Sequence, residues 1–446
     1  MWPKSELDVR DILVTAILVG LIPRCFTRPH VGVLTWSWVG YMNPHRLCWG
    51  FAFSLPAAQM VALPTLLGLF VSKEPKKIPW TAVSILLVIF FAWVTFTMAF
   101  AINPEDGWVQ WDKVLKVQIM VFITLMVMRT RERLHALVWI IVVSIGFFGV
   151  KGGLFTLTGG GQGLVGPQGS FISGNTEIGL AMTLVLPLMW YLRAHTPRQW
   201  VRQALLGAMG LTAIAILGSH SRGAFLAIVA SSVFLWWKSR NKAMIAVLAL
   251  MMLPVAFFFM PQEWRDRMAT IGTYQEDASA RGRINAWHFA INATKDRPIV
   301  GLGFQGFTPE AFQVWAPEPE NFHDAHSIYF QVLGEQGYPG LFLFLLILWL
   351  TWRNAAVVMR LARGDPQWLW AYDLAAMIQV SLVGYMVGGS FLGLAYWDLP
   401  YTLAAIVLLM RRLVEEEKLP QRAAVRRRPA VSADSDLPSL ARAGQA

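Results

Sequence analysis

The sequence predicts an all-α fold: a polytopic helical membrane protein with about 12 transmembrane helices and one large loop that contains helices of its own. Of the 446 residues, 55% are hydrophobic and only 15% are charged, whereas an average soluble domain has about 25% charged residues. Apolar runs recur along the whole chain, and many approach the roughly 20 residues that a helix needs to cross a bilayer.

The apolar runs define the predicted spans. Two short segments open the chain, at about 8–22 and 31–42, and each is shorter than a full crossing. Twelve or thirteen crossings therefore both fit, and the side of the N-terminus stays open. Fuller spans are expected at about 50–71, 79–101, 113–128, 134–156, 174–194, 202–219, 222–238, 242–260, 326–352, 370–393 and 397–412.

The connections between these spans alternate in charge. One set is rich in lysine and arginine, at residues 24–28, 73–77, 129–133, 193–202, 238–242 and 353–363. Basic short loops stay in the cytoplasm, so the other set, which includes the large loop, is expected on the side of the membrane away from the cytoplasm. Because the net charge of +11 is spread over these loops and the tail, we expect no nucleic-acid partner.

This topology divides the chain into four regions. Residues 1–260 and 326–412 hold the N-terminal and C-terminal transmembrane helices, and residues 261–325 form the large loop. Residues 413–446 lack apolar periodicity and are expected to be a disordered cytoplasmic tail. An ionisable residue at the edge of a span is costly to place there, so such residues are the first candidates for function.

Arg222 is the first such candidate. It lies in SHSRGAFLA, between a span that ends at Gly218 and one that starts at Ala224. The short connection keeps its guanidinium at the membrane surface, on the same side as the large loop. It suits an anionic ligand, and the alternative is an interfacial arginine whose head group reaches toward lipid.

The large loop contains a predicted helix with two arginines. Asp277 or Ser279 can cap a helix that runs toward Lys295 and stops before Pro298. Its apolar stripe consists of Ile284, Trp287, His288 and Ile291.

Arg281 and Arg283 of this helix are two residues apart and therefore point to different faces. A guanidinium suits bidentate recognition of phosphate, and we expect one of the two to bind a ligand while the other is solvated. The alternative is that both belong to an exposed charged face.

Two histidines, His323 and His326, lie where the chain re-enters the membrane. On a helix they would share a face and could hold a metal, but no third ligand follows at a familiar spacing, so no metal is expected. A neutral imidazole is better suited to general-base catalysis, since its pKa lies near ambient pH. A structural histidine at the membrane surface is the alternative for each.

Further cations lie on the same side of the membrane. Lys113 and Lys116 share a helix face after WVQWD and could neutralise a phosphate or reach toward lipid. The glycine-rich loop TGGGQGLVGPQGSFISGN is not a Walker A sequence, so no ATP site is expected. Several cations without matched anions, beside a candidate base, suit a donor that carries phosphate. A lipid-linked diphosphate arrives already activated and meets that need.

Three stretches of this sequence resemble the O-antigen ligase superfamily, which includes O-antigen polymerases and O-oligosaccharyltransferases. They are SHSRGAFLA, RGRINAW followed by RPIVGLGFQGF, and HSIYFQVLGEQGYPGLFLF. GNTEIGLAM resembles the family's outer loop more weakly, and HVGVLTWSWVGYMNPHRL is similar to the exosortase-associated O-glycosylation ligase branch. Asn175 and Gly303 in these motifs, together with His323, are secondary site candidates.

The resemblance implies a metal-independent, inverting glycosyltransferase without a cofactor. It implies transfer of a glycan from undecaprenyl diphosphate to a hydroxyl of a lipid A-core sugar or of a protein, as in lipopolysaccharide biosynthesis. The reaction would take place on the periplasmic face of a bacterial inner membrane, so the loop 261–325 would be a periplasmic catalytic loop. By motif position His326 corresponds to the catalytic histidine, and Arg222 and Arg283 to the family's arginines. The family often has His-Asn where this chain has His326-Ser327, so no role is assigned to residue 327.

Two alternatives stay open. An O-antigen polymerase or a protein O-oligosaccharyltransferase shares the same motifs. A transporter or flippase for the lipid-linked glycan is an alternative of another class, for which repeated halves with broken helices at the membrane midplane are expected. The candidate residues gather instead at one membrane face, which favours an enzyme.

Overall fold

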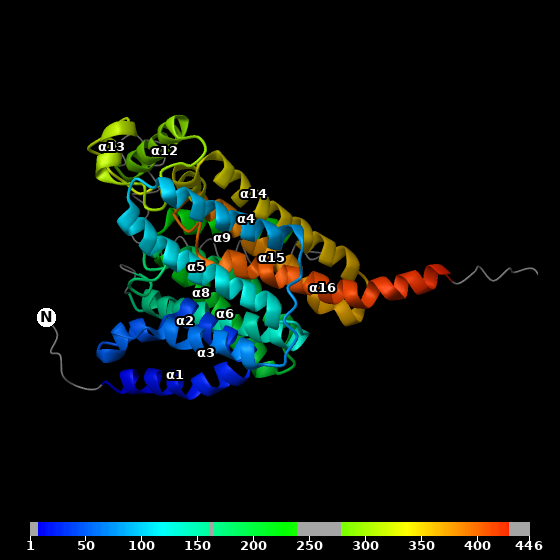
Figure 1. The fold of residues 1–446 in the computed structure, drawn as a ribbon. Helices are drawn as coiled ribbons and strands as arrows, with labels where there is room; N and C mark the ends of the chain where they lie inside the picture. The colour runs from blue at the N-terminus through cyan, green and yellow to red at the C-terminus, as the bar shows by residue number, and fades with distance from the viewer. Residues whose placement is uncertain (1–7, 160–163, 239–277, 428–446) are drawn as a thin grey trace, which may run out of the picture.

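The computed structural model describes residues 8–159, 164–238 and 278–427. Within these ranges the chain forms α-helices and short 3-10 helices and no strand, which confirms the all-α prediction. The helices lie side by side in a bundle, and α12 and α13 lie beyond one of its ends (Figure 1). The predicted span 242–260, the first part of the large loop with Asp277, and the last 19 residues of the chain, 428–446, are outside the described residues.

The α-helices follow one another in chain order as α1 (Val9–Thr27), α2 (Pro29–Met42), α3 (Ala57–Val71), α4 (Ala82–Thr97), α5 (Pro104–Val127), α6 (Arg131–Leu157), α7 (Asn175–His195), α8 (Gln199–Gly218), α9 (Arg222–Lys238), α12 (Ala278–Asp296), α13 (Pro309–Trp315), α14 (Ile328–Ala362), α15 (Leu369–Gly388) and α16 (Asp398–Arg427). Among the described helices, six are long and apolar enough to cross a membrane: α6, α7, α8 and α14, and α4 and α15 with the short 3-10 helices beside them. The protein is therefore a multi-pass membrane protein. We call the end of the bundle at which α12 and α13 lie the loop end.

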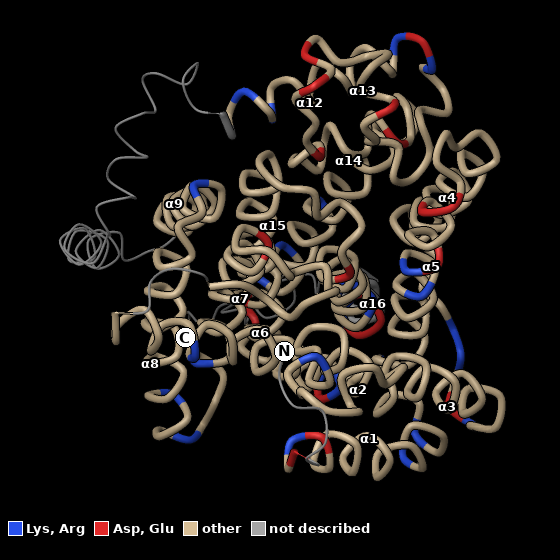
Figure 2. The backbone as a smooth tube through the Cα atoms, turned by 90° about the vertical axis from the view of Figure 1, so that its left-hand side faces the viewer, with Lys and Arg blue, Asp and Glu red and all other residues tan. Residues whose placement is uncertain are grey.

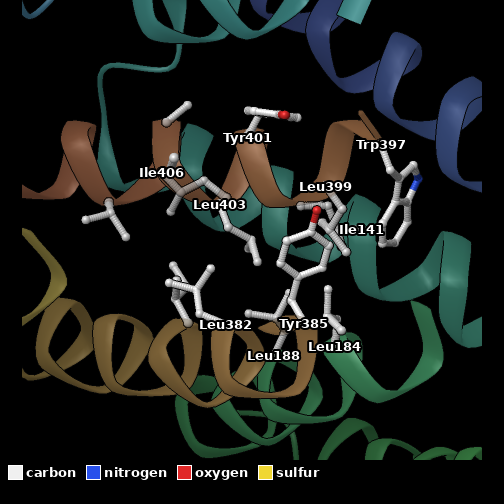
Figure 3. Close-up of a cluster of buried hydrophobic side chains, with 14 of the residues drawn as sticks. Ile141, Leu184, Leu188, Leu382, Tyr385, Trp397, Leu399, Tyr401, Leu403 and Ile406 are labelled. Atoms are coloured by element: carbon white, nitrogen blue, oxygen red, sulfur yellow. The ribbon is translucent and has the colours of Figure 1, made fainter. Parts of the chain in front are cut away.

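The centre of the bundle is an apolar core between α6, α7, α15 and α16. Side chains of these helices point toward one another in Figure 3, among them Ile141, Leu184, Leu188, Leu382, Leu399 and Leu403. The hydroxyl of Tyr385 in this core donates a hydrogen bond to the carbonyl of Leu394 (2.9 Å), so its polar atom is satisfied despite complete burial.

A break in α14 holds the large loop against the bundle. Pro339 has no N–H, so the carbonyl of Glu335, four residues earlier, cannot complete its helical hydrogen bond. The backbone N–H of Gly303 donates to this carbonyl instead (2.8 Å), and the N–H of Leu302 donates to the carbonyl of Gly334 (2.9 Å). The sequence motifs RPIVGLGFQGF and GEQGYPG therefore bind each other through their backbones.

Gly337 makes this contact sterically feasible. Its φ of 68° and ψ of −173° lie in a region that is essentially open to glycine alone. A Cβ atom at this position would lie 2.3 Å from the carbonyl oxygen of Ile299. The close approach of the two motifs thus requires glycine here.

Helix α12 buries a different face from the apolar stripe that the sequence singles out. Its buried side chains include Ala286, Phe289 and Ala293, whereas His288 of the stripe is exposed. The ring of Phe289 stacks on that of Phe312 in α13, with the ring centroids 4.2 Å apart. The contact with α13, which local periodicity does not reveal, decides which face is buried.

The last helix is longer than predicted. The sequence places the end of the span near residue 412 and a disordered tail from residue 413, whereas α16 continues to Arg427. Ion pairs between residues one turn apart stabilise the start of this extension, between Arg411 and Glu415 (2.7 Å) and between Arg412 and Glu416 (2.6 Å). Pairs of this spacing favour helix in a polar sequence.

Candidate functional site

A cavity of about 470 Å³ lies at the loop end of the bundle. Figure 2 looks along the bundle onto this end, with α12 and α13 at the top. Polar and charged side chains from segments distant in the sequence line the cavity: Asn43, Gln110, Lys113, Lys116, Ser170, Glu177, Gln305, Asp324, His326, Gln331, Glu335, Tyr396 and Asp398. Trp36, Phe171 and Phe307 add aromatic surface to its wall. Three of the residues predicted from the sequence, Lys113, Lys116 and His326, thus lie together.

His326 lies in the short segment before α14. The helix begins at Ile328, two residues later than the predicted span, because His326 has a left-handed backbone with φ of 39°. The indole of Trp287 in α12 donates a hydrogen bond to the carbonyl of Ala325 (2.9 Å) and fixes this segment. Burial lowers the pKa of His326, and the positive charge of Arg283 lowers it further. The imidazole is therefore neutral at neutral pH and able to accept a proton.

His323 does not pair with His326 as it would on one helix face, since both lie in a non-helical segment. Its ring packs on the backbone of α12 at Gly282, where a Cβ atom would lie only 2.5 Å from the ring. Its Nδ1 is buried without a hydrogen-bond partner in the described structure. Within the described ranges no three His, Cys, Asp or Glu side chains are grouped so that they could hold a metal ion.

The two arginines of α12 have different surroundings. Arg281 is exposed and forms an ion pair with Glu318 (3.7 Å), whose side chain is also half exposed. Arg283 is half-buried, and its charge acts on His326 and on Glu177. Arg283 is thus the arginine that can influence the cavity.

Arg222 is the first residue of α9 and is not among the residues that line the cavity. The preceding corner is fastened to α7, because the side chain of Asn175 donates a hydrogen bond to the carbonyl of Ser219 (3.0 Å). Glu177, in the first turn of the same helix, lines the cavity. Asn175 therefore connects the Arg222 corner to the helix that forms one wall of the site.

The expectation of cations without matched anions is wrong for two residues. Lys116 forms an ion pair with Asp112 one turn earlier on α5, and Arg281 pairs with Glu318. The cavity itself contains four carboxylates that the sequence prediction did not include: Glu177, Asp324, Glu335 and Asp398. Glu335 could have been singled out as an acidic residue inside an apolar run.

Gly303 fixes the backbone of Glu335 in the site. Its N–H donates to the carbonyl of Glu335, and a Cβ atom at Gly303 would lie 2.5 Å from that of Ala101. Two residues later, the N–H of Gln305 donates to the side-chain Oε1 of Glu335 (3.0 Å). The glycine motif therefore places a carboxylate in the cavity.

Fold and site together define a helical, multi-pass membrane protein with a polar cavity at one end of its bundle. Comparison with known families supplies a more specific class. Residues 207–345 match the family model described as O-antigen ligase, and residues 9–197 match a family of unknown function, DUF5935. No curated protein matches the chain.

The first of these matches confirms the resemblance seen in the motifs: residues 207–345 of this chain match the O-antigen ligase family. The match supports glycosyl transfer of the ligase or polymerase type, with a lipid-linked glycan and an acceptor as the general substrates. The similarity of the N-terminal stretch to the exosortase-associated branch stays a prediction.

Proposed function

We propose that the protein transfers a glycan from undecaprenyl diphosphate to a hydroxyl of a lipid A-core sugar. The cavity faces the periplasm from the inner membrane of a bacterium, and the reaction needs neither metal nor cofactor. The observation that carries the proposal is that His326, whose pKa is lowered by burial, lines one cavity with Lys113 and Lys116. A base and a phosphate-binding pair are the two groups that this reaction requires.

His326 accepts the proton of the acceptor hydroxyl. The oxygen then attacks the anomeric carbon of the donor sugar from the side opposite the diphosphate. The bond between the anomeric carbon and the diphosphate oxygen breaks, and its electron pair leaves with undecaprenyl diphosphate. One displacement inverts the anomeric centre and forms no covalent intermediate on the enzyme. Burial keeps His326 neutral, which this role needs.

The positive charges stabilise the leaving diphosphate. Lys113 contacts the cavity directly, and Lys116 does so while paired with Asp112. In the proposal Arg283 and Arg222 bind the same diphosphate. This assignment is supported by the electrostatic effect of Arg283 on His326 and by the position of Arg222 at the corner that Asn175 fastens to α7. Preorganised cations of this kind stabilise charge that develops in the transition state.

Reconstitution tests this proposal. The purified protein in lipid nanodiscs is mixed with undecaprenyl-diphosphate-linked glycan and with lipid A-core, and products are separated on a gel. Ligase activity shifts the lipid A-core band. Longer glycans on the lipid carrier would instead show a polymerase, glycan on a protein acceptor an O-oligosaccharyltransferase, and movement of intact donor across a vesicle bilayer without transfer a transporter.

A chelator tests the metal-free claim separately. Transfer is expected to continue at an unchanged rate in EDTA. Loss of transfer in EDTA, with recovery when a divalent cation is added back, contradicts this part of the proposal.

A further inference from the structure

Glu335 is almost fully buried, with an exposed fraction of 2%, yet only one of its carboxylate oxygens is bonded to protein. Oε1 accepts the hydrogen bond from the N–H of Gln305 (3.0 Å). Oε2 is buried and has no hydrogen-bond partner in the described part of the chain. Because Glu335 also lines the cavity, this oxygen is available to a ligand bound there.

We propose that Glu335 binds a hydroxyl group of a sugar that occupies the cavity. The inference rests on the proposed function and extends it from the reacting groups to the recognition of the glycan. An unsatisfied buried polar group is destabilising, so a buried carboxyl group with a free oxygen needs an explanation. A donor supplied by the substrate provides one.

The chemistry of Glu335 selects a hydroxyl rather than a phosphate. The free oxygen Oε2 accepts a hydrogen bond, and the oxygens of an ionised diphosphate have no proton to donate to it. A hydroxyl has a proton to donate, so it completes the hydrogen bond that Oε2 lacks. The cavity thus has cationic groups for the diphosphate and a hydrogen-bonding group for the sugar.

The neighbours of Glu335 suit a sugar as well. The hydroxyl of Tyr396 lies beside the carboxyl, and it accepts a hydrogen bond from the side chain of Gln336 (3.3 Å). Asp398 contributes a second buried oxygen, Oδ1, for which the described residues supply no partner. Phe307 adds an apolar ring to the same wall. A pocket with aromatic surface and a few placed polar groups is typical of small-ligand sites.

The backbone holds Glu335 in this position before any ligand binds. The N–H of Gly303 bonds its carbonyl, and that of Gln305 bonds its side chain. Gln305 has a left-handed backbone with φ of 56°, a strained conformation for a residue other than glycine. This strain points the N–H of Gln305 at the carboxylate, and a group that is fixed in advance binds its ligand with less loss of entropy.

The experiment measures binding to the full-length protein in nanodiscs, in a His326→Ala background where no transfer consumes the ligands. Three probes distinguish the possible sources of the hydroxyl: lipid A-core, undecaprenyl-diphosphate-linked glycan, and undecaprenyl diphosphate without sugar. Glu335→Gln retains the shape of the side chain and turns an acceptor oxygen into a donor. It is expected to raise the Kd of lipid A-core or of the glycan-bearing donor at least tenfold, while the Kd of the sugar-free lipid changes less than twofold.

The probe that responds identifies whether the acceptor or the donor sugar contacts Glu335. Glu105→Gln, which removes an exposed carboxylate at the same end of the bundle, is the matched control and should leave all three affinities unchanged. Unchanged binding of both sugar-bearing probes to Glu335→Gln overturns the inference, and so does weaker binding of the sugar-free lipid.

Glu335→Asp repeats the test with the charge kept and the carboxylate withdrawn by one methylene, and thermal unfolding shows whether each variant is folded. If Glu335 governs sugar binding but the wild-type protein transfers no glycan, the proposed function fails and the binding inference stands. If the wild type transfers glycan while Glu335→Gln binds both sugars normally, only the inference fails.

Discussion

Two buried or half-buried glutamates, at opposite ends of the bundle, use their oxygens differently. Glu74, in the connection after α3, accepts hydrogen bonds from both terminal nitrogens of Arg133, at 2.7 and 2.9 Å. Glu335 bonds the protein through one oxygen and leaves the other at the cavity. A carboxylate whose oxygens are both bonded by the protein stabilises the fold, whereas one with an oxygen at a cavity can bind a ligand.

The same contrast extends to the ends of the bundle. Away from the cavity, charged side chains pair with one another: His195 with Asp373 at 2.9 Å, and Lys418 with Asp365 at 2.9 Å. At the cavity, Asp398 and Glu335 each retain an oxygen without a hydrogen bond in the described structure. The two pairs away from the cavity therefore contribute to stability, whereas the free oxygens of Asp398 and Glu335 are available to a ligand.

The largest expected effect belongs to His326. His326→Ala should reduce transfer by about 10²–10⁴-fold, the usual contribution of a general base, while the midpoint of thermal unfolding stays near that of the wild type. The rate of transfer is measured with lipid-linked glycan and lipid A-core, and the midpoint of unfolding is measured in a fluorescence melt. A variant that transfers at the wild-type rate refutes the base assignment.

Glu74→Ala should show the opposite pattern. It removes two charge-assisted hydrogen bonds and leaves Arg133 without its carboxylate, so the free energy of unfolding should fall by about 1–3 kcal/mol with little change in transfer rate. Thermal melts and the transfer assay measure the two quantities. Loss of transfer in a variant that is still folded would contradict the division between the two ends.

The pH dependence of stability provides a second measure of Glu74. The hydrogen bond from Arg133 lowers the pKa of this carboxyl, so the folded state favours the ionised form. The stabilisation is fully present above the pKa of the unfolded chain, about 4.3, and is lost as the pH falls through the lower pKa of the folded state. Melts of the wild type and Glu74→Gln should therefore converge in acid.

A smaller effect is expected in the pH profile of transfer. Burial and the charge of Arg283 lower the pKa of His326, and Asp324 raises it. Activity needs the neutral imidazole, so kcat/KM of the wild type should persist below the usual histidine pKa. Arg283→Ala should move the acid limb to higher pH, and Asp324→Asn to lower pH. Shifts in the same direction for both variants would exclude His326 as the titrating group.

The smallest effect should come from Arg281. Its ion pair with Glu318 is exposed, and such pairs contribute about 0–1 kcal/mol. Arg281→Ala should therefore change stability and transfer much less than Arg283→Ala does. Equal losses of transfer in the two variants would show that both arginines bind the donor.

Much of this organisation could be predicted from the sequence. Apolar run length predicted helices, and the edges of those runs drew attention to Lys113, Lys116 and His326, which the structure places at one cavity. Arg281 and Arg283 are two residues apart and therefore point to different helix faces, and this spacing predicted their different surroundings. These inferences succeed because they depend on spacing along one helix or at its end.

Other features depend on contacts that spacing does not encode. Glu335 receives its hydrogen bond from Gln305, thirty residues earlier, and Phe289 selects the buried face of α12 by stacking on Phe312 in another helix. The presence of Pro339 predicts from the sequence that one carbonyl of α14 lacks its helical hydrogen bond. Nothing in the local sequence indicates that the N–H of Gly303 donates to that carbonyl. Contacts between distant segments therefore set the detail of the site.

The backbone exchange between the two motifs has a consequence for engineering. The N–H groups of Leu302 and Gly303 match the carbonyls that Pro339 and Gly337 leave open in α14, so the two stretches form one transplantable unit. A chimera with a relative should exchange residues 297–305 and 333–340 together. A graft of either stretch alone, or a one-residue insertion in either, would separate the N–H groups of Leu302 and Gly303 from the carbonyls that accept their hydrogen bonds. Glu335 would then be displaced from the cavity.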